Sequence, residues 1–523
     1  MHPNNKQMKL KHILSCLALF FAFNSSSIAQ IKKESTSVKV DISKDTVINF
    51  KKPQKSVTNG SVTVEGKRIN YEATTGILIL KNKEDSPTIS MSYVYYMKSG
   101  DDPSQRPITF IYNGGPGSAT IWLHMGAWGP QRVYLNDTSR TKPPYKTVNN
   151  DYSLLDVSDL VFIDAPGTGF GEVITKKMGG AGERKDFFGI DQDGRAFADF
   201  ITDFITEFNR WNSPKYLFGE SYGTFRSAVV SNLLQNQGVG LNGVILLSQL
   251  LTYSNMSDAA SEHPGDDKPY ELALPSFAAT AWYHHKLPDQ PAKLEPFLKE
   301  VEHFAMNDYA LALNKGASID SASFDQMAEK LHQYTGLPVE YLRKANLRVN
   351  GPQFEQALLG KNNQITGRLD SRFSGDAIDP LSEYAQYDPM DAYIDAAFTA
   401  TFNNYVRTEL KFGKAMKYKT FGDVGPWDFK RKGFLGFPNV MNDLAHAMVY
   451  NPDLKVMLNM GYFDLGTPYF EGVYEMQHLP MPKSLQKNIE YDFYESGHMV
   501  YLHPESLKQL HDNVARFINS SLK

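Results

Sequence analysis

The sequence predicts an α/β fold with a mostly parallel central sheet, helices on both of its faces and a helical insertion. Short apolar runs are typical of strands covered on both sides, and they lie at 108–112, 160–163, 216–218, 244–247, 456–458 and 491–494. Amphipathic helical stripes separate several of these runs, and one long stretch without alternation interrupts the pattern. Alternation of strand and helix favours an α/β sheet.

The elements before the first buried run follow another pattern. Apolar side chains alternate with polar ones between residues 62 and 95, which predicts half-buried strands of an antiparallel opening sheet. Two later stripes recur at helical spacing, and these are Phe197, Phe200, Ile201, Phe204, Ile205 and Phe208, then Leu507, Leu510, Val514, Phe517 and Ile518.

The stretch from about 251 to 430 predicts helices near 294–313, 324–331 and 391–410, joined by loops rich in Gly, Pro and Asp. We expect it to lie over the carboxyl ends of the strands, where open α/β sheets bind ligands. The predicted organisation is a signal peptide (1–29), a polar arm (30–60), a first core part (61–250), the helical insertion or cap (251–430) and a second core part (431–523).

The first thirty residues indicate a secretory signal peptide. Three lysines among the first eleven residues precede an apolar stretch from Ile13 to Phe23 and a small-residue cleavage pattern ending at Ala29. Eleven apolar residues are too few to span a bilayer, which disfavours a membrane anchor. Cys16 is the single cysteine and lies too close to the basic start for lipidation. We therefore expect a periplasmic or extracellular protein without disulfides or a stable membrane span.

Charge and motifs exclude other classes. The formal net charge of −4 gives no electrostatic footprint for nucleic acid. A metallopeptidase is disfavoured because the sequence has no H-E-x-x-H, and His284-His285 lacks the spacing of a helical metal pair. We expect neither a metal nor an organic cofactor.

The segment Gly219-Glu220-Ser221-Tyr222-Gly223 lies between a predicted strand and a predicted helix. A tight strand-to-helix turn pushes the serine side chain outward, and flanking glycines supply room where a side chain would collide. This context predicts that Ser221 is a nucleophile, which then needs a histidine base and a carboxylate to orient it.

Asp464 and His498 each follow one of two consecutive predicted strands, in the order that such an elbow requires. Both would lie on the ligand side of the sheet. The glycine-rich loop that begins at Asn113 follows the first buried run and lacks the Gly-Lys-Ser/Thr of a phosphate-binding loop. It occupies the position of half an oxyanion hole, and the Tyr222 backbone N–H would be the other half.

These motifs together resemble the serine carboxypeptidase family of α/β-hydrolase-fold peptidases, in a bacterial-type member. The matching segments are FIYNGGPGS, FIDAPGTGFG, GESYG, GYFDLGTP and SGHMV, in order between about 106 and 505. The resemblance implies removal of C-terminal residues from peptides with a free C-terminus, through an acyl-enzyme. It also implies residue roles: Ser221, Asp464 and His498 as catalytic triad, Gly115 and Tyr222 as oxyanion donors, and Asn113, Gly114 and Glu220 as the site for the substrate carboxylate.

A physical reason supports the role of Glu220. Two adjacent carboxylates repel each other unless they share a proton, so a glutamate that binds a carboxylate favours binding in acid. The family often has a second glutamate in this site, and the aligned residue here is Ala127. Ile111, Ser118 and Tyr462 are further departures from the family pattern, and none of them removes a triad member.

Two rival functions remain open at the level of sequence. An esterase or acyltransferase could use the same triad, since elbow and oxyanion hole serve any acyl transfer. A catalytically inactive binding module on this fold is the other rival, and the intact triad disfavours it. The preferred C-terminal residue, the oligomeric state and processing of a propeptide do not follow from the sequence.

Overall fold

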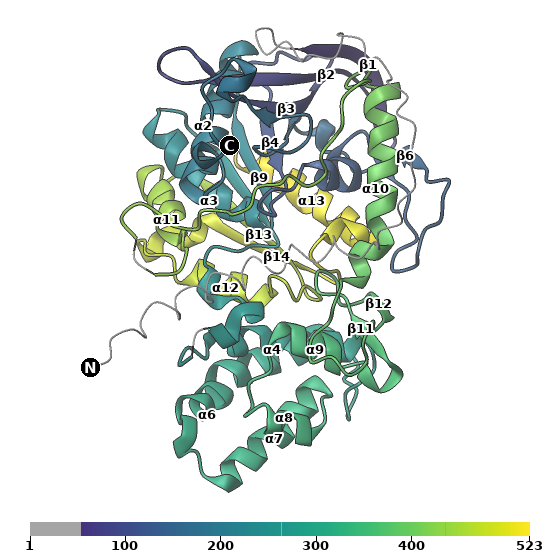
Figure 1. Cartoon of the computed structure of the whole chain (residues 1–523), viewed down its shortest axis with the longest axis vertical. Helices are drawn as coiled ribbons and strands as arrows, with labels where there is room; N and C mark the ends of the chain where they lie inside the picture. Colours follow the sequence, from purple (N-terminus) through teal and green to yellow (C-terminus); the bar gives the residue numbers. More distant parts are fainter. Residues whose placement is uncertain (1–53, 263, 435, 523) are drawn as a thin grey trace, which may run out of the picture.

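The computed structural model describes residues 54–262, 264–434 and 436–522 (Figure 1). Within these ranges the main sheet has ten strands in the order β1-β2-β3-β7-β4-β9-β10-β13-β14, with β8 beside β3. Its strands are β1 (Lys55–Val64), β2 (Lys67–Lys81), β3 (Pro87–Lys98), β4 (Ile108–Tyr112), β7 (Asp159–Ile163), β8 (Glu172–Val173), β9 (Lys215–Glu220), β10 (Gly243–Leu247), β13 (Lys455–Gly461) and β14 (Ile489–Tyr494).

The sheet divides into an antiparallel and a parallel part. β1, β2 and β3 pair antiparallel, and β3 joins the remainder through an antiparallel pairing with β7. From β7 to β14 every neighbouring pair is parallel. Because parallel strands end at the same edge, the loops after β4, β9, β13 and β14 meet there. The predicted fold class and the positions of all six predicted strands are confirmed, although β14 is an edge strand and is only half-buried over most of its length.

Helices cover both faces of this sheet. Along β9, Leu217 packs with the helices on one face, whereas Tyr216 and Phe218 pack on the other. The first layer contains α2 (Ile190–Glu207), α3 (Tyr222–Asn236), α11 (Met441–Tyr450) and α12 (Tyr469–Gln477), and the second contains α10 (Pro389–Thr408) and α13 (Pro504–Ser520). Both predicted amphipathic stripes fall on helices, α2 and α13, and are buried there apart from half-buried Phe208, the residue after α2.

The insertion forms a helical lobe at one end of the molecule (Figure 1). Its elements are α4 (Lys268–Tyr283), α5 (Leu294–Phe304), α6 (Ala310–Asn314), α7 (Ser321–Thr335), α8 (Val339–Lys344), α9 (Gly351–Ala357), β11 (Gln364–Thr366) and β12 (Ser374–Asp376). α10 departs from the expectation of a cap, because it runs back along the flank of the core. Its Phe398 and Phe402 pack there with Trp122 and His124.

A short segment of the insertion lies against the loops after β13 and β14. The Leu369 carbonyl accepts a hydrogen bond from the His498 N–H (2.6 Å), and the Arg368 carbonyl accepts one from the Leu465 N–H (3.0 Å). Ser371 donates its N–H to the Phe463 carbonyl (2.9 Å). The insertion therefore helps to position the loops that carry Asp464 and His498.

The N-terminal predictions have mixed outcomes. The signal peptide and most of the polar arm lie outside the described residues. The arm was expected to reach residue 60, but β1 begins at Lys55 and pairs with β2 over its whole length. No helix in the described ranges is long and apolar enough to cross a membrane. A small antiparallel pair, β5 (Gln131–Val133) and β6 (Thr147–Asn149), was not expected from the sequence.

Candidate active site

Ser221 lies in a tight turn between β9 and α3, as the glycine pattern predicts. Its φ of 60° and ψ of −133° are rare for a residue with a side chain, and such strain is concentrated at functional sites. A Cβ on Gly219 would lie 2.2 Å from the Gly223 carbonyl oxygen, so glycine is required for the turn to close. The Ser221 side chain is half-buried at this corner.

Asp464 and His498 lie together at the carboxyl edge of the sheet. His498 Nδ1 donates to Asp464 Oδ2 over 2.7 Å, and both side chains are buried. Asp464 accepts three further hydrogen bonds, from the backbone N–H groups of Gly466 and Thr467 and from the Thr467 hydroxyl. Because Nδ1 carries its proton toward the carboxylate, Nε2 is the ring nitrogen that can accept a proton.

The electrostatics of His498 suit a base that becomes charged. Burial alone would lower the pKa of His498, but the neighbouring Asp464 and Glu220 carboxyl groups outweigh it, so the pKa is raised. Arg368 acts in the opposite direction. An imidazolium formed at this position would therefore be stabilised by Asp464, which is the orienting role expected of a triad carboxylate.

The predicted oxyanion residues come from the loop after β4 and from the start of α3, which touch each other. A Cβ on Gly114 would lie 2.4 Å from the backbone nitrogen of Tyr222, so the loop after β4 reaches the first turn of α3 only because residue 114 is glycine. Gly115 follows with a φ of 107°. The helix start also supplies positive dipole character near Ser221, which favours a developing negative charge.

Asn113 and Glu220 form a buried pair beside the elbow. Asn113 Nδ2 donates to Glu220 Oε1 (2.9 Å), while Asn113 Oδ1 accepts from the Leu123 N–H (3.1 Å). Burial raises the pKa of Glu220 to about 7, although His498, Tyr501 and Asn113 lower it in part. A carboxyl group with such a pKa is largely protonated in mild acid and can donate a hydrogen bond there.

Two supporting groups were not expected from the sequence. Arg226 on α3 donates to the Asn113 carbonyl (2.7 Å) and pairs with Asp193 on α2 (2.7 Å), so a buried ion pair fixes the loop that carries Asn113. The Thr467 hydroxyl donates a hydrogen bond to Asp464, and its oxygen lies 3.2 Å from His498 Nδ1. The spacing Asp464-x-x-Thr467 suits such local capping, whereas the contact of Arg226 depends on the packing of α2 against α3.

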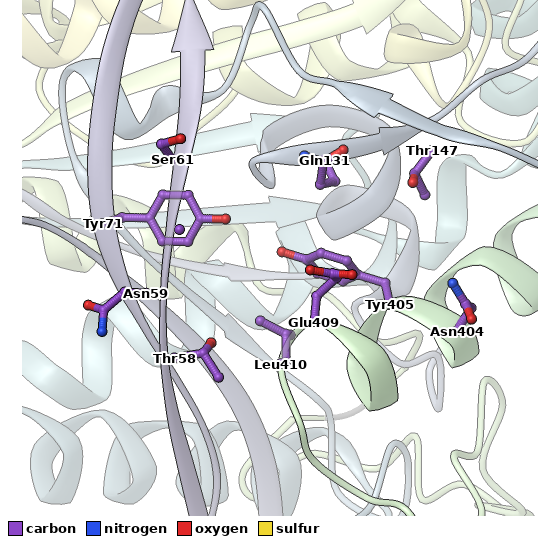
Figure 2. Close-up of a pocket in the computed structure, with 11 residues that line it drawn as sticks. Thr58, Asn59, Ser61, Tyr71, Gln131, Thr147, Asn404, Tyr405, Glu409 and Leu410 are labelled. Carbon is purple, nitrogen blue, oxygen red and sulfur yellow. The ribbon is translucent and has the colours of Figure 1, made fainter.

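A polar cavity of about 390 Å³ lies between β1, β2 and the end of α10 (Figure 2). Tyr71, Tyr405 and Glu409 line it together with amide and hydroxyl side chains, and none of the predicted site residues does. The Tyr405 hydroxyl is hydrogen-bonded to Tyr96 (3.0 Å), which is bonded to His124 (2.8 Å). This cavity is therefore separate from the candidate active site.

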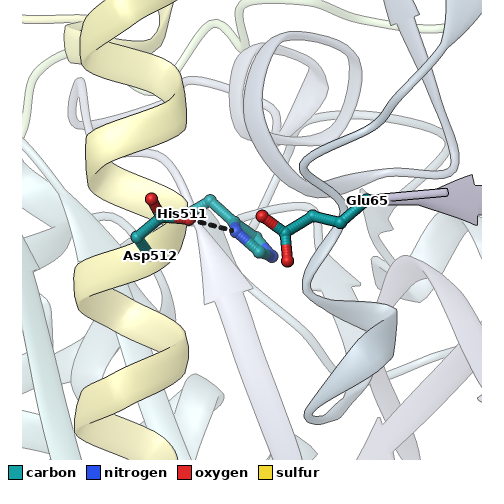
Figure 3. Close-up of side chains that lie close together, drawn as sticks. All are labelled: Glu65, His511 and Asp512. Atoms are coloured by element: carbon teal, nitrogen blue, oxygen red, sulfur yellow. Dashed lines mark hydrogen bonds and ion pairs between the residues drawn. The ribbon is translucent and has the colours of Figure 1, made fainter. Parts of the chain in front are cut away.

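Glu65, His511 and Asp512 form another cluster, where the β1–β2 turn meets α13 (Figure 3). Nδ1 of His511 lies 3.2 Å from Asp512 and Nε2 lies 3.3 Å from Asp156. Burial lowers the pKa of His511, but these two carboxylates raise it above its ordinary value. Lys508 also pairs with Asp512 (2.6 Å). Lys508 and His511 already pair with Asp512 and Asp156, so we assign these contacts to ion pairing.

The fold and the elbow define the class: an α/β hydrolase. The family model described as serine carboxypeptidase matches residues 65–290. This match covers less than half of the chain, and over that part the chain is similar to the serine carboxypeptidase family.

Individual relatives match over shorter stretches. Serine carboxypeptidase-like 2 of Arabidopsis thaliana is 25% identical over 193 residues, which are 35% of this chain and 41% of that protein. Serine carboxypeptidase-like 7 of the same plant is 28% identical over 157 residues, or 29% of this chain and 32% of that protein. This chain thus spans less than half the length of these curated relatives.

Among solved structures, the chain is similar to Kex1Δp, a prohormone-processing carboxypeptidase from Saccharomyces cerevisiae. The superposition has a TM-score of 0.51 and covers 86% of this chain and 92% of that one, at 16% identity. At this identity the likeness supports the fold, and the roles of individual residues stay predictions.

Proposed function

We propose that this protein is an exported serine carboxypeptidase, which hydrolyses the C-terminal peptide bond of peptides with a free C-terminus. One observation carries the proposal. Glu220, a buried carboxyl group with a pKa of about 7, directly precedes Ser221 and is held by Asn113. A protonated carboxyl beside the nucleophile is suited to bind a carboxylate, and simple esters would not need it.

In the acylation step, His498 Nε2 takes the proton of the Ser221 hydroxyl as Oγ attacks the scissile carbonyl carbon. The carbonyl π electrons move to the oxygen, which the backbone N–H groups of Gly115 and Tyr222 stabilise. When the tetrahedral intermediate collapses, the C–N bond breaks and His498 gives its proton to the leaving amine. The departing amino acid carries the carboxylate that Glu220, Asn113 and Gly114 recognise.

Deacylation repeats these transfers with water. His498 removes a proton from the water molecule as the water oxygen attacks the acyl carbon. When the ester bond breaks, His498 passes this proton to Ser221 Oγ. Asp464 orients the imidazole and stabilises its charged form in both steps. The two proposed reaction steps require no metal or organic cofactor.

A matched set of substrates tests the proposal. Wild-type protein should hydrolyse a free-acid peptide in preference to its C-terminal amide, and KM for the acid should rise with pH as the shared proton is lost. In Glu220→Gln this pH dependence of KM should be flat, since the amide donates without titrating. Equal KM profiles for acid and amide, with faster turnover of simple esters, would favour the esterase or acyltransferase instead.

A fluorophosphonate probe tests the remaining rival, a catalytically inactive binding module. It should label wild-type protein at Ser221 and leave Ser221→Ala unlabelled. Absence of labelling in folded wild-type protein would favour the binding module.

Export and domain organisation are part of the same proposal. We expect the mature chain to begin near Gln30 outside the cytoplasm, followed by two core parts that the insertion 251–430 separates. N-terminal sequencing of protein from the native host would show this directly. A chain that retains Met1 would contradict export by signal cleavage.

A further inference from the structure

Tyr501 lies beside the Asn113–Glu220 pair and has no role in the triad. It belongs to the short turn Val500–Leu502, three residues after His498, and its side chain is buried. Its hydroxyl lies next to both Glu220 and Asn113. A side chain from the loop after β14 thus reaches the same point as side chains from the ends of β4 and β9.

The packing around the ring fixes this position. A Cβ on Gly126 would lie 2.5 Å from Cε2 of Tyr501, so the ring occupies space that only glycine at 126 leaves free. Phe398 of α10 also packs at this point. Ala127, the next residue, is small and buried and contributes no second acid. The packing of the ring therefore holds the Tyr501 hydroxyl in place beside Glu220.

Two oxygens at this point lack partners. The Tyr501 hydroxyl and Glu220 Oε2 are both buried, and neither makes a hydrogen bond of acceptable geometry within the described residues. The other Glu220 oxygen is satisfied by Asn113. Burying an unpaired polar group costs free energy, and such groups are uncommon unless a ligand or water completes them.

We propose that the Tyr501 hydroxyl and protonated Glu220 act as a pair of donors that bind the two oxygens of the substrate's C-terminal carboxylate. Tyr501 is then a specificity-determining residue of the active site. This inference rests on the proposed function, because it names how the same site recognises its substrate. A C-terminal amide offers a single acceptor oxygen, so it could satisfy one of the two donors.

The test is Tyr501→Phe, which removes the hydroxyl and keeps the ring against Gly126. KM for a free-acid peptide should rise about tenfold or more, as expected for a lost hydrogen bond to a charged group. The kcat for the acid should change less than about twofold, and kcat/KM for the matched C-terminal amide should fall less than kcat/KM for the acid, because the amide uses only one of the two donors. The melting temperature should change little, because the hydroxyl makes no hydrogen bond of acceptable geometry within the described residues.

Tyr216→Phe is the matched control. The Tyr216 hydroxyl is bonded to Ser521 (2.7 Å) and to the Ile518 carbonyl (3.2 Å), so its loss should lower the melting temperature and leave KM for the acid unchanged. An unchanged acid KM in Tyr501→Phe would overturn the inference, and so would an equal rise for acid and amide. Failure of wild-type protein to prefer the acid would instead refute the proposed function.

Discussion

Glu220 and Glu475 are two buried carboxyl groups whose pKa burial raises to about 7, yet their surroundings differ. Glu475 on α12 is fully satisfied: Oε2 accepts from Gln249 Nε2 (3.1 Å) and the Leu251 N–H (2.8 Å), and Oε1 accepts from Asn255 (3.2 Å). Glu220 has one satisfied oxygen and one without a partner.

The difference shows that a raised pKa alone does not identify a binding group. Burial also raises the pKa of Glu471, the neighbour of Glu475. Glu475 fixes the loop after β10 to α12. Such a group is structural, because every donor around it comes from the protein. Glu220 instead retains hydrogen-bonding capacity beside the nucleophile, and this unused capacity supports its assignment to the substrate.

The largest expected effect is a loss of kcat when the proposed catalytic residues near Glu220 are replaced. Ser221→Ala should lower kcat by roughly four to six orders of magnitude, and Asp464→Asn by about four, because they remove the nucleophile and the orienting carboxylate. Circular dichroism should show an intact fold in both variants. Near-normal turnover by purified Ser221→Ala would show that Ser221 is not the nucleophile. Glu220 would then not lie beside the reacting atoms, and its proposed role in substrate binding would lose its support.

The next effect concerns stability against pH. Both glutamates have a folded pKa of about 7 against an ordinary 4.5, so the folded state binds more protons between these values. The contribution is fully present below pH 4.5 and is lost as pH rises through 7, by roughly 3 kcal/mol per group at most. Urea unfolding between pH 5 and 8 measures it.

Other groups titrate in that range, so the comparison uses variants. The buried His124 and the half-buried His284 have lowered pKa values and act in the opposite direction below pH 6.5. The loss of unfolding free energy from pH 5 to 8 should therefore be smaller in Glu220→Gln and in Glu475→Gln than in wild type. Equal pH slopes in all three proteins would contradict the raised pKa values.

Much of the fold was predictable because its signals are local. The apolar runs 108–112 and 216–218 lie in β4 and β9 as expected, since period and length decide strand character. The sequence analysis did not predict α4, because Pro275 lies inside this helix. It also did not predict the π-helix Ala305–Tyr309 that lies between α5 and α6. The course of α10 along the core follows from tertiary packing of Phe398, which no local pattern encodes.

The site shows the same division. The elbow, Asp464 and His498 lie on predictable strand ends, and the structure brings the last two together. The motifs also pointed to Asn113 and Glu220, whose hydrogen bond is observed. Tyr501 could not be found from the sequence, because its approach to Glu220 depends on the space that Gly126 leaves on the short π-helix Leu123–Trp128.

Replacement of either glutamate by glutamine should have a smaller effect, on the free energy of unfolding, and this effect should differ between Glu475 and Glu220. Glu475→Gln replaces one acceptor oxygen by an NH₂ group that faces donors, so the free energy of unfolding at pH 5 should fall by about 1–3 kcal/mol. Glu220→Gln should change it by less than about 1 kcal/mol, because its second oxygen has no partner. Urea unfolding tests both, and equal destabilisation would mean that the two carboxyls are structural alike.

The smallest expected effect is a shift of the acid limb of kcat. The Glu220 carboxylate raises the pKa of His498, and in the range where His498 titrates Glu220 is partly ionised. Removing that charge in Glu220→Gln should let His498 lose its proton at lower pH, so the limb should move to lower pH. The measurement uses a peptide amide as substrate. It has no C-terminal carboxylate, so the binding of a carboxylate does not affect the pH profile of kcat. The main groups that shift the pKa of His498 are Asp464, Glu220 and Arg368, so Glu475→Gln should leave the limb in place. A limb that moves equally in both variants would mean that the shift comes from net charge and not from contact with the base.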